Sequence, residues 1–88
     1  MKIIFSDHAR RRMGERDISS FQVSSAILQP DKIEVDKTTP NRFVAKKVYA
    51  INKSEKKHLL LVFYEFHPET DQIEVITVVS TSKIRKYY

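Results

Sequence analysis

The spacing of hydrophobic and polar positions changes near residue 32. Before it, apolar residues recur at helical intervals, and after it they alternate with polar ones, as is typical of strands. A short run rich in Ile and Phe, residues 2–5, precedes both regions and favours a first strand. The pattern therefore predicts helices in the N-terminal third and strands in the rest.

Two polar side chains mark where the helices begin. Ser6 is placed to cap a helix that runs to about Arg16. Ser19 and Gln22 have the spacing of a capping box, in which each residue bonds to the backbone of the other. Pro30 ends this second helix near residue 28 or 29, because the residue before a proline is forced out of the helical conformation.

The later segments predict strands at 32–35, 42–51, 58–66 and 72–81, with turns at 38–41 and 67–71 and a polar connection at 52–57. The segment 58–66 is almost entirely apolar, so we expect it at the centre of the sheet. We expect one α+β domain over residues 1–88. In it, two N-terminal helices, preceded by a short strand, pack on a three- to four-stranded antiparallel sheet.

Composition narrows the function classes. With 88 residues and 41% hydrophobic positions the chain predicts a small soluble domain, and no apolar run approaches the roughly 20 residues of a membrane span. The absence of cysteine excludes disulfides, thiolate catalysis and zinc–thiolate sites. The first residues do not form a signal peptide, so a cytoplasmic location without membrane partners is expected.

The charge of the chain favours polyanionic partners. Sixteen Lys and Arg against 11 Asp and Glu give a net charge of +5. Such an excess on a small surface suits nucleic acid, an anionic membrane or an acidic protein. Net charge alone does not choose among the three.

On the first predicted helix, His8, Arg12 and Arg16 are spaced four residues apart and form one row. The row lies beside the apolar positions Ala9 and Met13, which we expect to face the sheet. Two guanidinium groups and an imidazole fixed at the edge of a core suit the binding of a phosphate, because guanidinium groups match phosphate oxygens in pairs.

A structural role for this row is the alternative. The two arginines would then form ion pairs with Glu15, Glu34 or Glu65, and His8 would bond to the backbone at the helix start. The spacing of the residues leaves both interpretations open.

Further candidates for nucleic-acid contact lie on the strands and in the C-terminal tail: Arg42, Lys46, Tyr64, Thr81, Lys83 and Arg85. Glu65 interrupts the most apolar strand, either as a partner of a first-helix arginine or as a catalytic base. The tail from residue 83 to 88 combines three cations with two aromatic residues, which suits contact with a nucleic-acid backbone, whereas a packed or frayed terminus is the alternative. No pair of histidines has metal-ligand spacing, so we expect no metal and no cofactor.

The stretch from His8 to Ile18, H-A-R-R-R-M-G-E-R-D-I, resembles a family of small prokaryotic domains of unknown function. The family pattern H-A-x-x-R-M-x-x-R-x-I, followed by an apolar helix and a proline, is matched by His8, Ala9, Arg12, Met13, Arg16, Ile18, Val23 and Pro30. Asp17 stands where the family commonly has glycine, a departure that affects the turn between the helices more than any chemistry. The apolar strand 58–66 and the segment 76–83 extend the resemblance over nearly the whole chain.

That family is similar in layout to the BrnT, RelE and ParE toxins and other small metal-independent ribonucleases, and the resemblance implies a toxin-like endoribonuclease. The implied reaction is attack of a ribose 2′-hydroxyl on the adjacent phosphate of RNA. His8 would act as acid or base, and Arg12 and Arg16 would stabilise the phosphate charge. Two alternatives remain open: a non-catalytic nucleic-acid-binding module, and an interaction module that holds a partner such as an acidic antitoxin-like protein.

Overall fold

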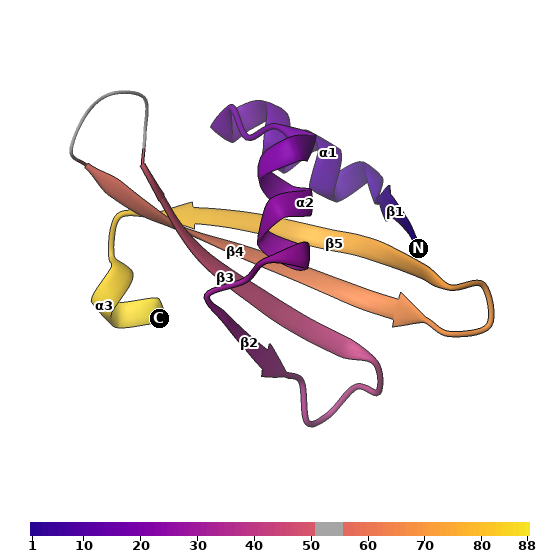
Figure 1. The fold of residues 1–88 in the computed structure, drawn as a ribbon. Helices are drawn as coiled ribbons and strands as arrows, with labels where there is room; N and C mark the ends of the chain where they lie inside the picture. The colour runs from indigo at the N-terminus through magenta and orange to yellow at the C-terminus, as the bar shows by residue number, and fades with distance from the viewer. Residues whose placement is uncertain (51–55) are drawn as a thin grey trace.

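A computed structural model describes residues 1–50 and 56–88. Its elements, drawn in Figure 1, are β1 (Lys2–Phe5), α1 (Asp7–Arg16), α2 (Ser20–Leu28), β2 (Lys32–Val35), β3 (Arg42–Ala50), β4 (Lys57–His67), β5 (Gln72–Thr81) and α3 (Ile84–Tyr87). The predicted end of a strand at 51 and most of the predicted connection 52–57 lie outside the described residues. No helix in the described part of the chain is both long enough and apolar enough to cross a membrane.

The strands form one mixed sheet in the order β1-β5-β4-β3-β2. β1 runs parallel to β5, whereas the other neighbouring pairs are antiparallel. The predicted three- to four-stranded antiparallel sheet, with its likeness to the RelE, ParE and BrnT layout, is therefore wrong. The physical reason lies in β1: its Ile3 and Phe5 pack against the core, and pairing with β5 places them there.

The two N-terminal helices begin at their predicted caps. The Ser6 hydroxyl accepts a hydrogen bond from the Ala9 amide at 3.0 Å and donates to the Ile76 carbonyl at 2.9 Å, which ties the start of α1 to β5. Ser19 and Gln22 form the capping box of α2. Between the helices, Asp17 caps α1 in the left-handed conformation with φ of 54°. Glycine adopts that conformation freely and Asp more readily than most residues, so the chain turns here without a glycine.

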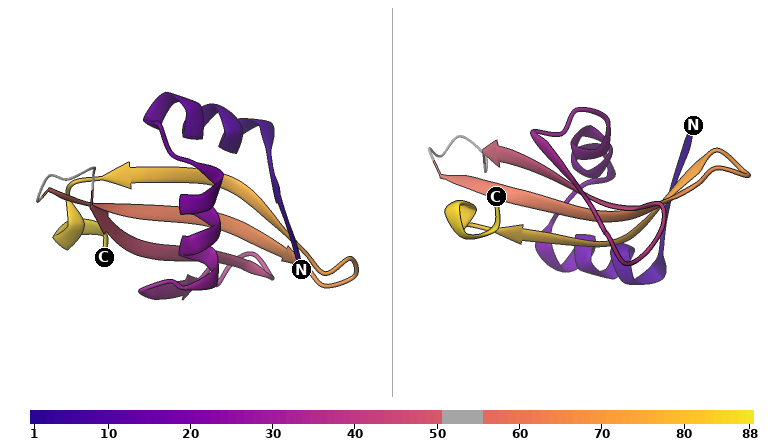
Figure 2. Two further views of the ribbon diagram at one scale, coloured as in Figure 1. Left: turned by 45° about the horizontal axis from the view of Figure 1, so that its top comes forward. Right: turned by 90° about the horizontal axis from the view of Figure 1, so that it is seen from below.

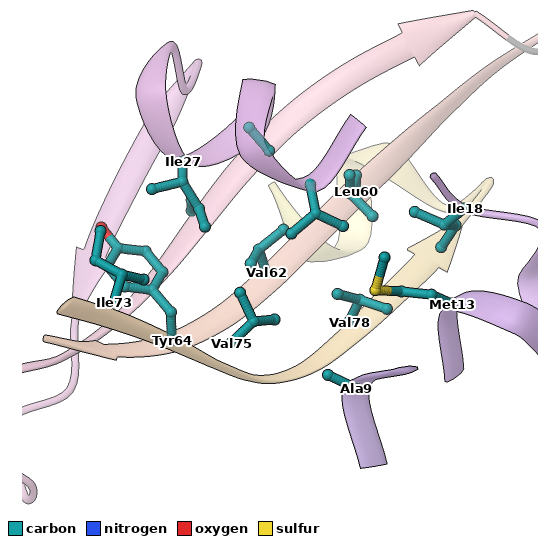
Figure 3. Close-up of a cluster of buried hydrophobic side chains, with 13 residues drawn as sticks. Ala9, Met13, Ile18, Ile27, Leu60, Val62, Tyr64, Ile73, Val75 and Val78 are labelled. Carbon is teal, nitrogen blue, oxygen red and sulfur yellow. The ribbon is translucent and has the colours of Figure 1, made fainter. Parts of the chain in front are cut away.

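The core lies between these two helices and one face of the sheet. α1 runs beside β5, and α2 crosses β3 and β4 (Figures 1 and 2). Met13 of α1 lies against Val78 of β5, and the Ile27 side chain points from α2 toward the sheet (Figure 3). Residues of this buried cluster are Ala9, Met13, Ile18, Val23, Ala26, Ile27, Ala45, Leu60, Val62, Tyr64, Ile73, Val75 and Val78.

The opposite face of the sheet is covered in part by α3. Side chains alternate along a strand, so Lys46 and Leu61 face away from α1 and α2. Tyr87 of α3 lines a hollow of about 200 Å³ on this face together with Lys46, Leu61 and Phe63. The basic and aromatic tail is thus a short helix packed on the sheet, and it does not extend along the strands.

Candidate functional site

A pocket of about 400 Å³ opens where the two N-terminal helices meet and β5 ends. It takes residues from five elements or their caps: Arg16, Asp17, Gln22, Tyr49, Ala50, His58 and Ser80. Tyr49 and His58 are direct partners in the β3–β4 ladder, and Ser80 pairs with the core residue Leu60. These three polar side chains therefore continue the helix-covered face of the sheet beyond its apolar core.

The Ser80 hydroxyl joins the polar groups of this pocket. Its oxygen lies 2.6 Å from the Tyr49 hydroxyl oxygen and 3.3 Å from Nδ1 of His58. The rings of Tyr49 and His58 meet edge to face, with centroids 6.1 Å apart. All three side chains are half-buried. An imidazole held through Nδ1 by a hydroxyl group is oriented to exchange a proton through its other nitrogen.

Arg16 brings a positive charge to the wall of the same pocket. It ends the row that His8 begins, which spans about 12 Å of α1 at the helical rise of about 1.5 Å per residue. His8 and Arg16 are exposed and Arg12 is half-buried. His8 and Arg12 do not line the pocket. The structure therefore joins only Arg16 of the predicted row to the polar cluster.

The ion pairs offered as a structural role for the row do not occur among residues 1–50 and 56–88. Glu34 pairs with Lys32 and Lys46, and Glu65 pairs with Arg42 at 2.9 Å. Within that part of the chain Arg12 and Arg16 have no carboxylate partner, so their guanidinium groups remain available for an anion.

Lys46 lies on the opposite face of the sheet from the pocket and is only 7% exposed. Its ammonium group contacts the Glu34 carboxylate and donates to the carbonyl oxygens of Tyr87 at 2.7 Å and Tyr88 at 3.2 Å. The hydrogen bond and the charge of Lys46 lower the pKa of Glu34 below its ordinary value. Lys46 thus holds α3 against the sheet.

Arg42 shares the Lys46 face. The Glu65 carboxylate, which pairs with Arg42, also lies 3.8 Å from Nε2 of His67. The same nitrogen of His67 lies 3.2 Å from the Glu74 carboxylate. The Arg42 Nε atom is buried without a hydrogen-bond partner. Within the described residues, no group of three or more His, Cys, Asp or Glu side chains is arranged to hold a metal ion.

Tyr64 belongs to the core: its side chain stacks on Phe43 with ring centroids 5.5 Å apart, and burial raises the pKa of its hydroxyl. Thr81, Lys83 and Arg85 gather at the C-terminal end, where the Thr81 hydroxyl accepts a hydrogen bond from the Lys83 amide at 3.1 Å. None of these four lines the pocket. The structure does not bring the predicted nucleic-acid contacts together with the row on α1.

Sequence reasoning misses Tyr49 and His58. Both lie near the ends of strands whose other side chains on the same face belong to the core, and neither residue is part of a motif. The available signal is alternation: Tyr49 follows Phe43, Ala45 and Lys47 on one face of β3, and the face of β4 that carries Leu60, Val62 and Tyr64 begins with His58. Polar rings at the end of an apolar face predict the rim of a core, which is where this pocket lies.

A family model described as a domain of unknown function, DUF4258, matches residues 5–80. Because the match covers most of the 88 residues, the chain belongs to this family. No curated protein and no solved structure matches the chain.

Proposed function

We propose that this member of the DUF4258 family is a metal-independent endoribonuclease of the toxin type, which cleaves RNA in the pocket formed by Arg16, Tyr49, His58 and Ser80. The family carries no assigned function, so the proposal rests on the site. The observation that carries it is the Ser80 hydroxyl, which contacts both His58 and Tyr49 in a pocket that also contains Arg16.

The cations of α1 support binding of an RNA backbone. Arg16 would hold the phosphate at which the strand is cut, because a guanidinium group donates two parallel hydrogen bonds to phosphate oxygens. Arg12 and His8 lie one and two turns earlier on the same helix, and they would contact neighbouring phosphates. The net charge of +5 would speed the encounter with RNA.

The cleavage step needs a base and an acid. His58 would remove the proton from a ribose 2′-hydroxyl, whose oxygen then attacks the adjacent phosphorus. The bond from phosphorus to the 5′-oxygen breaks, and the Tyr49 hydroxyl would give its proton to that oxygen. The products are a 2′,3′-cyclic phosphate and a free 5′-hydroxyl, and exchange with water restores both side chains. Arg16 would stabilise the added negative charge on the phosphorane.

Cleavage of a mixed RNA in the presence of excess chelator tests the proposal. The wild type is expected to give products, and His58→Ala to lose activity by about a hundredfold or more, as is typical for an acid–base group. His67→Ala is the matched control, because His67 lies on the opposite face of the sheet. Equal cleavage by wild type and His58→Ala, or no cleavage by either, would overturn the assignment. RNA binding that weakens steeply with salt but gives no product would identify a non-catalytic binding module instead.

Exposed apolar side chains favour a second candidate function, the binding of an acidic antitoxin-like protein. Leu28, Ile33 and Val35 are 63%, 47% and 62% exposed beside the open edge of β2. An unpaired strand edge accepts a strand of another chain. The test is co-purification with the protein encoded beside the gene: binding that Val35→Asp abolishes supports this role, and binding that survives the change contradicts it.

A further inference from the structure

A second, apolar hollow adjoins the pocket at Gln22 and Tyr49, which line both. It measures about 190 Å³ and is formed by Phe21, Gln22, Ser25, Lys47, Tyr49 and Leu60. Ligand pockets for drug-sized molecules span roughly 300–1,000 Å³, so a hollow of this size suits a single planar ring system. An apolar compartment therefore lies directly beside one that contains Arg16 and His58.

Phe21 makes this compartment unusual. Its side chain is 79% exposed, the largest exposed fraction among the large hydrophobic residues of the described chain. The core does not use it, because Val23, Ala26 and Ile27 form the buried side of α2. Gln22 beside it is fixed by the capping box, in which its side-chain oxygen accepts a hydrogen bond from the Ser19 amide at 2.8 Å. Phe21 is thus an exposed aromatic ring on a well-anchored helix start.

We propose that Phe21 and this hollow form a nucleobase subsite, so that the substrate is single-stranded RNA; the inference rests on the proposed function. A nucleotide joins a charged phosphate to a flat apolar base, and the two adjoining compartments offer a matching pair of surfaces. Aromatic side chains bind bases of any sequence by stacking. In a duplex the base faces are covered by their neighbours, so only an unpaired base can enter.

Binding of short 2′-O-methyl RNA tests this subsite without cleavage, because the attacking hydroxyl is blocked. The probes are one single strand, the same strand without bases, and its duplex. We expect the wild type to bind the single strand about tenfold or more tightly than either other probe. Phe21→Ala should lose about tenfold on the single strand and nothing on the strand without bases. Ser20→Ala, at the exposed position of α2 next to Phe21, is the control and should bind as the wild type does.

The outcomes separate this inference from the proposed function. If the wild type binds the strands with and without bases equally, or if Phe21→Ala binds the single strand as the wild type does, the nucleobase subsite is wrong and the ribonuclease proposal is unaffected. If the wild type binds none of the probes, the proposed function fails and the subsite fails with it.

Discussion

The hydroxyl oxygens of Tyr49 and Ser80 lie 2.6 Å apart although their strands, β3 and β5, are not neighbours. β4 lies between them, and the Tyr49 side chain reaches across its end. His58 of β4 contacts the same serine. Three strands therefore contribute side chains to one hydrogen-bonded group. Arg16, the residue of the α1 row that lines the pocket, borders this group.

Replacing Ser80 tests whether it positions His58. In Ser80→Ala the imidazole loses its partner at Nδ1, and we expect RNA cleavage to fall about tenfold to a hundredfold, less than for loss of the acid–base group itself. Ser80→Thr, which keeps the hydroxyl, should restore the cleavage rate. A rate in Ser80→Ala equal to that of the wild type would contradict a positioning role.

Arg16 is expected to contact a phosphate directly. Arg16→Gln should weaken binding to all single-stranded RNA sequences alike and reduce the slope of log K against log salt by about 0.7, the effect of one lost phosphate contact on a single strand. Titrations at several salt concentrations measure this slope. Arg11→Gln removes the same charge from an exposed position of α1 outside the row and should leave the slope closer to that of the wild type. Equal slopes for Arg16→Gln and the wild type would exclude the contact.

The contact between Lys46 and Glu34 predicts a pH-dependent contribution to stability. Lys46 lowers the pKa of Glu34 below 4.5 in the folded chain. A carboxyl group whose pKa is lower in the folded than in the unfolded chain stabilises the fold at pH values above its unfolded pKa. This contribution is lost as the pH falls through its folded pKa. The wild type should therefore unfold at a higher urea concentration than Glu34→Gln at pH 7. Below pH 4.5 the difference in urea midpoint between the two proteins should shrink. A difference that stays constant down to pH 3 would show that it does not arise from the charge of Glu34.

Met13 is expected to anchor α1 to the sheet. Its side chain is 9% exposed and packs in the core beside Val78. Met13→Ala removes this packing and should lower the free energy of unfolding by about 2–5 kcal/mol, as other Met-to-Ala changes in cores do. Urea denaturation measures the loss. Arg10→Ala on the exposed side of α1 should change stability by less than about 0.5 kcal/mol.

Local signals of the sequence predict the helix starts and the strand ranges, but not how the strands pair into a sheet. The caps at Ser6 and Ser19 fix the helix starts because each satisfies backbone amides within a few residues. The parallel partnership of β1 with β5 depends on residues about 70 positions apart, and no local pattern encodes it. This explains why the sequence pattern alone predicts a fully antiparallel sheet.

The same limit applies to the site. His8, Arg12 and Arg16 share a helix face, so their spacing predicts that they form one row. Tyr49 and His58 meet Ser80 only through the register of three strands, which includes an irregularity between Phe63 and Tyr64. Register of this kind depends on packing over the whole sheet. Lys46 looks like a surface cation in the sequence, but α3 covers it.

The most direct test of the account is an end-group analysis of RNA incubated with the chain in excess chelator. The account predicts fragments that carry 2′,3′-cyclic phosphate and 5′-hydroxyl ends with the wild type and with His67→Ala, and at least a hundredfold less product with His58→Ala. Fragments formed at equal rates by wild type and His58→Ala, or an absence of fragments with the wild type, would contradict it.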